Sequence, residues 1–261
     1  MSIQCSLAFV ISSATLLGLG LTTKHMDQKE NQLSIPIAIL IAGVIVAGAI
    51  VFTKGSSSLK SASVKTATEE QGKFNVNPIS DKDHVLGGQG AQIFIIEYSD
   101  LECPFCKQFH ATMKRVIEEY GEDGSVAWVY RHFPLDSIHS KAQKEAEGAE
   151  CAAQLGGEIK FWEFVDKIFE ITPSNNGLDL DILPEIAVEI GLSKEKFEKC
   201  LGDGVQAERV EEDAKSAINA GGQGTPYSIF VTKDNEVLFS IPGAVPFEAI
   251  KDAIDKALKE I

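Results

Sequence analysis

A long uncharged stretch near the N-terminus constrains this chain more than any other feature. Twenty-three consecutive residues, from Asn31 to Thr53, carry no charge, and those from Ile35 to Phe52 are almost wholly aliphatic. A helix of about 20 such residues crosses the hydrocarbon core of a bilayer. Pro36 stands near its start, where a missing backbone N–H is best tolerated. We therefore predict a single transmembrane anchor over residues 31–53.

Two alternatives to a retained anchor stay open. The segment would also suit a buried core helix, and Ala47-Gly48-Ala49 has the small-x-small spacing of a signal-peptide cleavage site. Cleavage there would leave Ile50-Val51-Phe52 close to the mature N-terminus, which is an unsuitable apolar start, so we favour the retained anchor. Lysines lie on both sides of the span, so the positive-inside rule does not orient it.

Residues 1–30 form an N-terminal leader. Its apolar run, Leu7 to Leu21, has only 15 residues and is diluted with Ser, Thr and Gly, so it is too short to span a bilayer comfortably. Met26 begins a short polar lead directly before the anchor. We therefore hypothesise that residues 1–25 belong to an upstream start codon that is not used, in which case Cys5 needs no function.

Composition separates the rest of the chain into a linker and a domain. Residues 54–75 are rich in Ser, Thr and Lys and poor in large apolar groups, which predicts a flexible linker. The net charge of the whole chain is −14, but residues 74–261 alone carry −16. Nucleic acid is therefore excluded as the main partner, because phosphate binding needs a basic surface. The globular domain is predicted over residues 76–261.

The domain alternates between strand-like and helix-like segments. Short apolar runs predict strands, and longer runs with apolar residues three and four apart predict helices. The expected strands cover 92–98, 125–132, 227–231 and 236–241, and the expected helices cover 107–120 and 246–259, with a nearly continuous helical block over about 138–218. This order predicts an α/β fold with an all-helical insert.

Reactive chemistry is expected at Cys103-Pro104-Phe105-Cys106, between a strand and a helix. This position puts the first sulfur at the helix N-terminus, where free N–H groups and the helix dipole stabilise a thiolate. Pro104 suits the first helical position. Such a pair exchanges a disulfide with a substrate. Cys103 is then the sulfur that attacks or is attacked, and Cys106 resolves the mixed disulfide.

Two other interpretations of the cysteine pair stay open. Cys103, Cys106 and His110 have the spacing C-x2-C-x3-H, which would suit zinc, but no second cysteine pair or nearby histidine follows at zinc-finger spacing. A proline between the cysteines also suits a dithiol better, so we expect no metal. A purely structural disulfide is the second interpretation, although closing a two-residue loop stabilises a protein little.

The cysteine motif, the helical block and Gly224-Thr225-Pro226 before a later strand together resemble the DsbA-like branch of the thioredoxin superfamily over residues 76–261. The resemblance implies a thioredoxin-like fold with an inserted helical domain. It also implies that Pro226 is cis, with Thr225 facing the dithiol and helping to dock the backbone of a substrate.

Two residues bear on the acidity of the thiols. Glu97, six residues before Cys103, resembles the buried acid that modulates the thiols in this family. The alternative is an ordinary carboxylate facing water at a strand end. Phe105 departs from the pattern of the most oxidising members, which carry a histidine there. Without that imidazole, we expect the pKa of Cys103 to lie between the ~3.5 of DsbA and the ~7 of thioredoxin.

The resemblance implies a thiol–disulfide oxidoreductase that introduces disulfides into exported proteins, with no cofactor beyond its redox-active disulfide. The predicted anchor makes it a single-pass protein of the cell membrane, and we expect the catalytic domain on the extracytoplasmic side, where disulfides persist. Exported thiol-containing proteins would be its substrates and a quinone-linked membrane oxidase its recycling partner. A reductase or isomerase on the same scaffold, or a non-catalytic thioredoxin-like binding module, stays open.

Cys151 and Cys200 both fall in the helical block. Two buried free cysteines are one interpretation, since cysteine is a common core residue. In an oxidising compartment, two core cysteines of one small helical unit are expected to pair, so we predict a structural disulfide between them.

Some charged residues receive plainer predictions. His132 and His139 flank a proline-containing loop after a strand, where we expect surface or helix-capping roles. The acidic runs from Glu145 to Glu150 and from Glu208 to Asp213 are predicted to be solvated helix faces.

Overall fold

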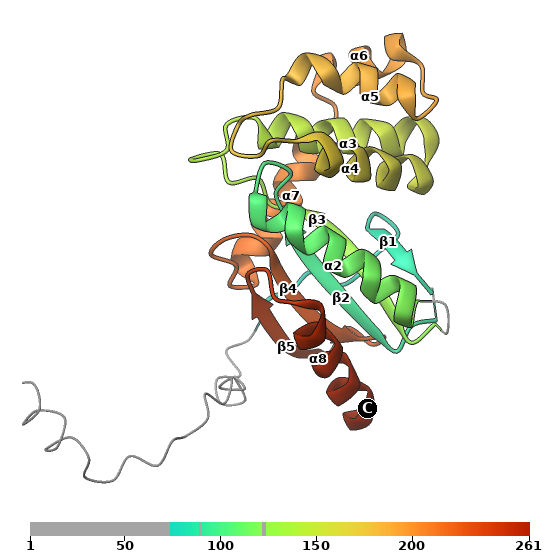
Figure 1. Cartoon of the computed structure of the whole chain (residues 1–261), viewed down its shortest axis with the longest axis vertical. Helices are drawn as coiled ribbons and strands as arrows, with labels where there is room; N and C mark the ends of the chain where they lie inside the picture. Colours follow the sequence, from blue (N-terminus) through green and yellow to red (C-terminus); the bar gives the residue numbers. More distant parts are fainter. Residues whose placement is uncertain (1–73, 89, 122–123) are drawn as a thin grey trace, which may run out of the picture. The chain divides into compact units, whose positions relative to one another are not determined.

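A five-stranded sheet forms the centre of the fold (Figure 1). The computed structural model describes residues 74–88, 90–121 and 124–261. Its strands lie side by side in the order β1-β3-β2-β4-β5. Their bounds are β1 His84–Gly87, β2 Ile93–Ser99, β3 Val126–His132, β4 Tyr227–Thr232 and β5 Val237–Pro242.

Strands β2 and β3 are parallel, and every other neighbouring pair is antiparallel. Parallel neighbours need a crossover connection, which helix α2 (Pro104–Tyr120) supplies. Strands β4 and β5 are joined by a tight turn in which Asn235 has a φ of 62°, a left-handed conformation that asparagine tolerates well. Because β2 and β3 are parallel, their carboxyl ends, Ser99 and His132, lie side by side at the same end of the sheet.

Helices cover both faces of the sheet. One face packs against α2 and α8 (Phe247–Glu260), where Ile95 and Trp128 meet Phe109 and Ile254 in one hydrophobic cluster. The opposite face packs against α7 (Ala207–Asn219) and the segment that leads into the domain. Because both faces are buried, β2 and β3 are almost continuously apolar, as strands in the middle of an α/β sheet are.

An all-helical insert separates β3 from β4, and Figure 1 shows it beyond one edge of the sheet. Its aromatic core includes Phe164 and Phe197, whose rings lie 5.4 Å apart. The predicted α/β thioredoxin-like fold with an inserted helical region is thus confirmed. The elements of the insert, before α7, are α3 Ala142–Gly156, α4 Glu158–Ile171, η1 Leu180–Ile182, α5 Leu183–Glu189 and α6 Lys194–Asp203.

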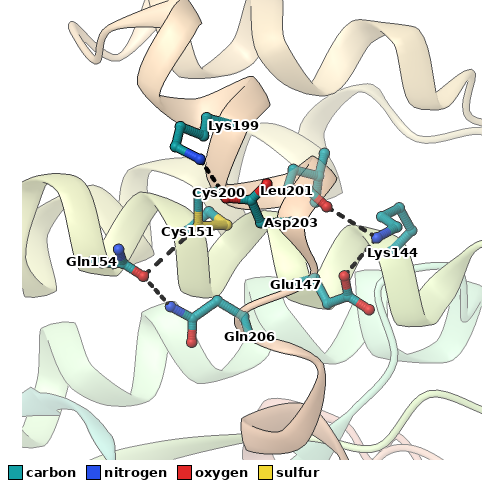
Figure 2. The surroundings of a disulfide bond; sticks show 9 residues. All are labelled: Lys144, Glu147, Cys151, Gln154, Lys199, Cys200, Leu201, Asp203 and Gln206. Atoms are coloured by element: carbon teal, nitrogen blue, oxygen red, sulfur yellow. Dashed lines mark hydrogen bonds and ion pairs between the residues drawn. A yellow bond between two sulfur atoms is a disulfide. The ribbon is translucent and has the colours of Figure 1, made fainter.

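A disulfide joins α3 to α6 inside the insert (Figure 2). It links Cys151 and Cys200, which are 49 residues apart in the sequence. Lys144 of α3 also donates a hydrogen bond to the carbonyl of Leu201, at 3.2 Å. Helices α3 and α6 are therefore held together by a covalent bond as well as by packing.

Several of the predicted carboxylates on solvated helix faces are in fact buried, so that prediction was wrong for them. Glu150 lies between two imidazoles, with its Oε1 3.3 Å from Nε2 of His84 and 3.3 Å from Nε2 of His132. Asp213 accepts a hydrogen bond from the backbone N–H of His132 at 3.1 Å. These acids face partners from β1 and β3, which are distant in the sequence, and Asp213 also pairs with Arg209 of its own helix.

Two further differences concern the start of the domain. Strand β1 was not predicted, because four residues that begin with a histidine give no strand pattern. The predicted leader, the membrane anchor and the linker up to residue 73 lie outside the described residues. Among the described residues, no helix combines the length and the apolar character that a membrane crossing requires.

Removing the insert's disulfide should destabilise the domain. Closing a loop with a sequence separation of 49 corresponds to about 4 kcal/mol in the chain-entropy model. The Cys151→Ala/Cys200→Ala variant is therefore expected to unfold at lower urea concentration, with its free energy of unfolding reduced by about 4 kcal/mol. Non-reducing peptide mapping of a Cys103→Ala/Cys106→Ala variant should recover a joined Cys151–Cys200 peptide. Two separate alkylated peptides would contradict the pairing.

Candidate active site

Cys103 and Cys106 stand at the start of α2, after the three-residue loop that follows β2. Cys103 is the N-cap residue, with the extended dihedral angles φ −80° and ψ 122°, and Pro104 occupies the first helical turn. Cys103 is 4% exposed, Cys106 is fully buried, and the Phe105 side chain between them is 61% exposed. Both cysteines are therefore buried, Cys106 more deeply than Cys103, and the ring between them is exposed.

Cys103 faces the loop before β4. Its thiol donates to the carbonyl oxygen of Thr225 at 3.5 Å, and the peptide bond between Thr225 and Pro226 is cis. The carbonyl of Pro226 in turn accepts the backbone N–H of Gly243 at 2.8 Å, which ties this loop to the end of β5. The structure thus brings Thr225 and Pro226 next to the cysteine motif, although about 120 residues separate them in the sequence.

The two thiols differ strongly in acidity. A hydrogen bond from Cys106 is the main factor that lowers the pKa of Cys103 to about 6, and the N–H groups of Phe105 and Cys106 add to it. Burial raises the pKa of Cys106 well above its ordinary value. At neutral pH, Cys103 is therefore largely a thiolate and Cys106 a thiol. A thiolate is the nucleophilic form of cysteine, so the surroundings of Cys103 suit a nucleophile and those of Cys106 do not.

Glu97 lies in the middle of the sheet, below the cysteine pair. It pairs with Tyr130 of β3 and Ser228 of β4, and it is fully buried. Burial raises its pKa to about 8, although Ser99 and Trp128 face the carboxyl group and lower it slightly. Glu97 does not face water, which excludes that alternative. It is a neutral acid at pH 7 that interacts electrostatically with both cysteines.

Asp100 organises the loop between β2 and α2, and sequence reasoning missed it. Its backbone carbonyl accepts the N–H of Cys103 at 3.1 Å, and its backbone N–H donates to Sγ of Cys106 at 3.4 Å. Its buried carboxylate accepts three N–H groups, from Glu102 at 2.8 Å, Leu135 at 2.8 Å and the His139 ring at 2.9 Å. An aspartate just before a helix start is a common loop residue, so the sequence carried no distinctive signal.

His132 and His139 are buried, so the surface roles predicted for them were wrong. His132 is 1% exposed and lies against Glu150, whereas His139 is 4% exposed and donates to Asp100. Both belong to the loop region at the carboxyl end of β3, where side chains from the sheet and the insert meet. Only the tertiary structure brings their carboxylate partners to them. His110 is a third buried case, paired with Asp166 of α4 at 2.6 Å, and no group of three metal-ligating side chains occurs among the described residues.

The loop after α4 contacts Glu102, the residue before Cys103. Three consecutive residues, Ser174–Asn176, have left-handed φ angles of 64°, 53° and 64°. Such residues are held there only by good contacts. The backbone N–H of Asn175 donates to the carbonyl of Glu102 at 2.8 Å, and that of Asn176 donates to the Glu102 carboxylate. Glu102, the residue before Cys103, therefore joins the cysteine motif to the insert.

A second buried acid supports this contact from α3. Burial and the neighbouring Glu102 carboxylate raise the pKa of Glu145 to about 9, so Glu145 keeps its proton at neutral pH. The proton on Glu145 avoids placing two negative charges side by side in the interior. The cysteine motif thus rests on groups from β2, β3, α3 and the loop after α4.

A family model described as thioredoxin matches residues 80–256 of this chain. The chain belongs to the thioredoxin family. The crystal structure of DsbA2 from Pseudomonas aeruginosa, another thioredoxin-fold protein, is 28% identical, with a TM-score of 0.59 over 71% of this chain and 99% of that one. BdbD from Bacillus subtilis has a TM-score of 0.62 over 71% and 98% of the two chains, and its 22% identity makes this a likeness of fold.

These likenesses identify a DsbA-like thiol–disulfide oxidoreductase fold in the thioredoxin family, with Cys103 and Cys106 as its close cysteine pair. A DsbA-like redox disulfide needs no cofactor, because the electrons move between sulfur atoms. Among curated proteins, Na(+)/H(+) antiporter NhaA 3 of Salinispora tropica is 34% identical over 150 residues, or 56% of this chain. The chain spans only 21% of that protein, so the antiporter activity in its name carries no weight here.

Replacing Glu97 should change how stability depends on pH. The native pKa of about 8 exceeds the ordinary 4.5, so the folded protein holds a proton that the unfolded chain loses. Stability is therefore lost as pH rises from about 5 to 8, by up to about 1.4 kcal/mol per pH unit. The Glu97→Gln variant does not lose stability in this way. Its free energy of unfolding should therefore rise relative to that of its parent as the pH increases from about 5 to 8.

The measurement is urea unfolding at pH 5.5, 6.5, 7.5 and 8.5, in a Cys103→Ala/Cys106→Ala background so that no thiol titrates. Glu145 titrates in both proteins, and its contribution cancels in the comparison. Parallel pH profiles for the parent and the variant would contradict a raised pKa for Glu97.

Proposed function

We propose that this chain oxidises pairs of thiols in exported proteins, on the extracytoplasmic side of the cell membrane, from an anchor over residues 31–53. The observation that carries the proposal is the contrast between the two thiols. Stabilising the Cys103 thiolate stabilises the reduced protein, and a dithiol whose reduced form is stabilised has a more oxidising disulfide.

The reaction proceeds by two thiol–disulfide exchanges. A substrate thiolate attacks Cys103 in the Cys103–Cys106 disulfide; a bond to Cys103 forms, and Cys106 leaves with the electron pair. Because burial makes the Cys106 thiolate unfavourable, it takes up a proton, for which the protonated Glu97 is the nearby buried donor. A second substrate thiolate then attacks the substrate sulfur, and Cys103 leaves as a thiolate. The substrate gains a disulfide and the protein is reduced by two electrons.

The surface around Cys103 suits an unfolded protein substrate. Phe105 is 61% exposed, and Ile138, in the loop that carries His139, is 62% exposed. Exposed apolar side chains beside a reactive sulfur favour binding of unfolded, apolar segments. We expect the backbone at Thr225, next to the cis peptide bond, to pair with the backbone of the substrate.

The proposed location has separate support. The disulfide between Cys151 and Cys200 is of a kind that persists in oxidising compartments and is rare in the cytosol. An anchored enzyme on the extracytoplasmic side would meet exported chains as they emerge. After each turnover the reduced pair must lose two electrons, and a quinone-linked membrane oxidase is the proposed acceptor, on the basis of the likeness to DsbA.

Oxidation of reduced ribonuclease tests the proposal. The oxidised protein should restore ribonuclease activity, Cys103→Ala should abolish this, and the potential of the cysteine pair against glutathione should lie above thioredoxin's ~−270 mV. A potential at or below that value, together with efficient insulin reduction, would favour a reductase or isomerase. Full biological activity of Cys103→Ala would favour a non-catalytic binding module.

A further inference from the structure

His139 lies in the loop after β3, outside the cysteine motif, yet it is tied to that motif. Its ring Nδ1–H donates to the Asp100 carboxylate at 2.9 Å, and Asp100 holds the backbone N–H of Cys103 and the sulfur of Cys106. The ring is 4% exposed. A buried imidazole that donates to a carboxylate has a fixed orientation, since one ring nitrogen is committed to that bond.

We propose that His139, oriented by Asp100, is the cationic partner that stabilises the Cys103 thiolate. This inference rests on the proposed function, whose last step releases that thiolate. His139 acts on the sulfur through its charge, and Asp100 is the residue that positions it.

The charge of His139 follows from its surroundings. Burial alone would lower its pKa, but the Asp100 carboxylate, the Asn175 side chain and the Cys103 thiolate together raise it above the ordinary value of 6.5. The interaction with Cys103 is reciprocal: if the thiolate favours the imidazolium, the imidazolium favours the thiolate by the same free energy. In a site this buried, one such charge acts more strongly than it would in water.

Asp100 does not cancel this effect. Besides the His139 ring, its carboxylate accepts the backbone N–H groups of Glu102 and Leu135, and these two dipoles offset part of its negative charge. Three acids and one lysine are the other titratable groups around this loop. They are Asp136 in the same loop, Glu102 before Cys103, Glu145 in α3 and Lys141 at the start of α3. Glu145 is protonated at neutral pH, so it adds no charge.

The consequence concerns the release of product. When the second substrate thiolate attacks, the new disulfide forms within the substrate, the bond between the substrate and Cys103 breaks, and the electron pair stays on the sulfur of Cys103. A sulfur whose thiolate is stabilised leaves faster. His139 therefore speeds release of the oxidised substrate and raises the reduction potential of the pair.

Replacing His139 tests this in the full-length reduced protein. Without the charge, the pKa of Cys103, followed by thiolate absorbance, should rise by about one unit in His139→Gln. At pH 8, where Cys103 is mostly ionised in both proteins, the equilibrium constant for oxidising glutathione should fall about tenfold, which equals ~30 mV for this two-electron couple. The matched control is His84→Gln. His84 is another buried histidine, in β1, and it pairs with the carboxylates of Glu150 and Glu158.

The control should leave the pKa of Cys103 unchanged. A Cys103 pKa in His139→Gln within 0.2 units of the parent, or an equal shift in His84→Gln, would overturn the proposal, because a merely structural role lowers only the melting temperature. The ribonuclease assay reports separately on the proposed function. A parent protein that fails to oxidise ribonuclease refutes that function, whereas these pKa values do not depend on any substrate.

A second measurement needs no variant. In the wild-type protein, the pKa of His139, followed by NMR, should be higher in the reduced form, where Cys103 is a thiolate, than in the oxidised form, where it carries no charge. Equal pKa values in the two redox states would overturn the proposal even if His139→Gln does not fold.

Discussion

The buried carboxylate of Asp100 is the interaction on which the cysteine site depends. It gathers the N–H groups of Glu102, the loop after β3 and the His139 ring, while its own backbone contacts Cys103 and Cys106. An ionised group in the interior is tolerated only when its hydrogen bonds are made, so these partners are obliged to stay in place. The same bonds that satisfy the acid therefore fix the two sulfurs relative to the end of β3.

Helix α3 links this site to the rest of the domain. Its Glu145 is a protonated acid next to Glu102, the residue before Cys103, and its Glu150 lies between imidazoles of β1 and β3. Its Cys151 carries the disulfide to α6. One helix thus places polar groups against the sheet edge and a covalent bond toward the outside of the insert. The insert is held to the cysteine site by buried ionisable groups, which are directional, as well as by apolar packing, which is not.

The features that the sequence predicted correctly are those set by residues close together along the chain. The strand before Cys103, the helix after it and the helical insert all follow from local periodicity, and the α/β thioredoxin-like fold is confirmed. The burial of Glu145, Glu150 and His139 could not be predicted in this way. Their partners belong to other elements, and a charged residue on a helix looks the same in sequence whether it faces water or a buried imidazole.

Those buried groups also change the meaning of the chain's charge. The formal value of −14 treats Glu97 and Glu145 as ionised and histidines as neutral. With pKa values of about 8 and 9, both acids are neutral at pH 7, and the pKa of His84 is about 9 because Glu150 and Glu158 outweigh its burial. These three groups alone make the domain about three charges less negative than its formula. Next to Cys103 the exposed group is the uncharged ring of Phe105, so docking there depends on apolar and backbone contacts more than on the acidic surface.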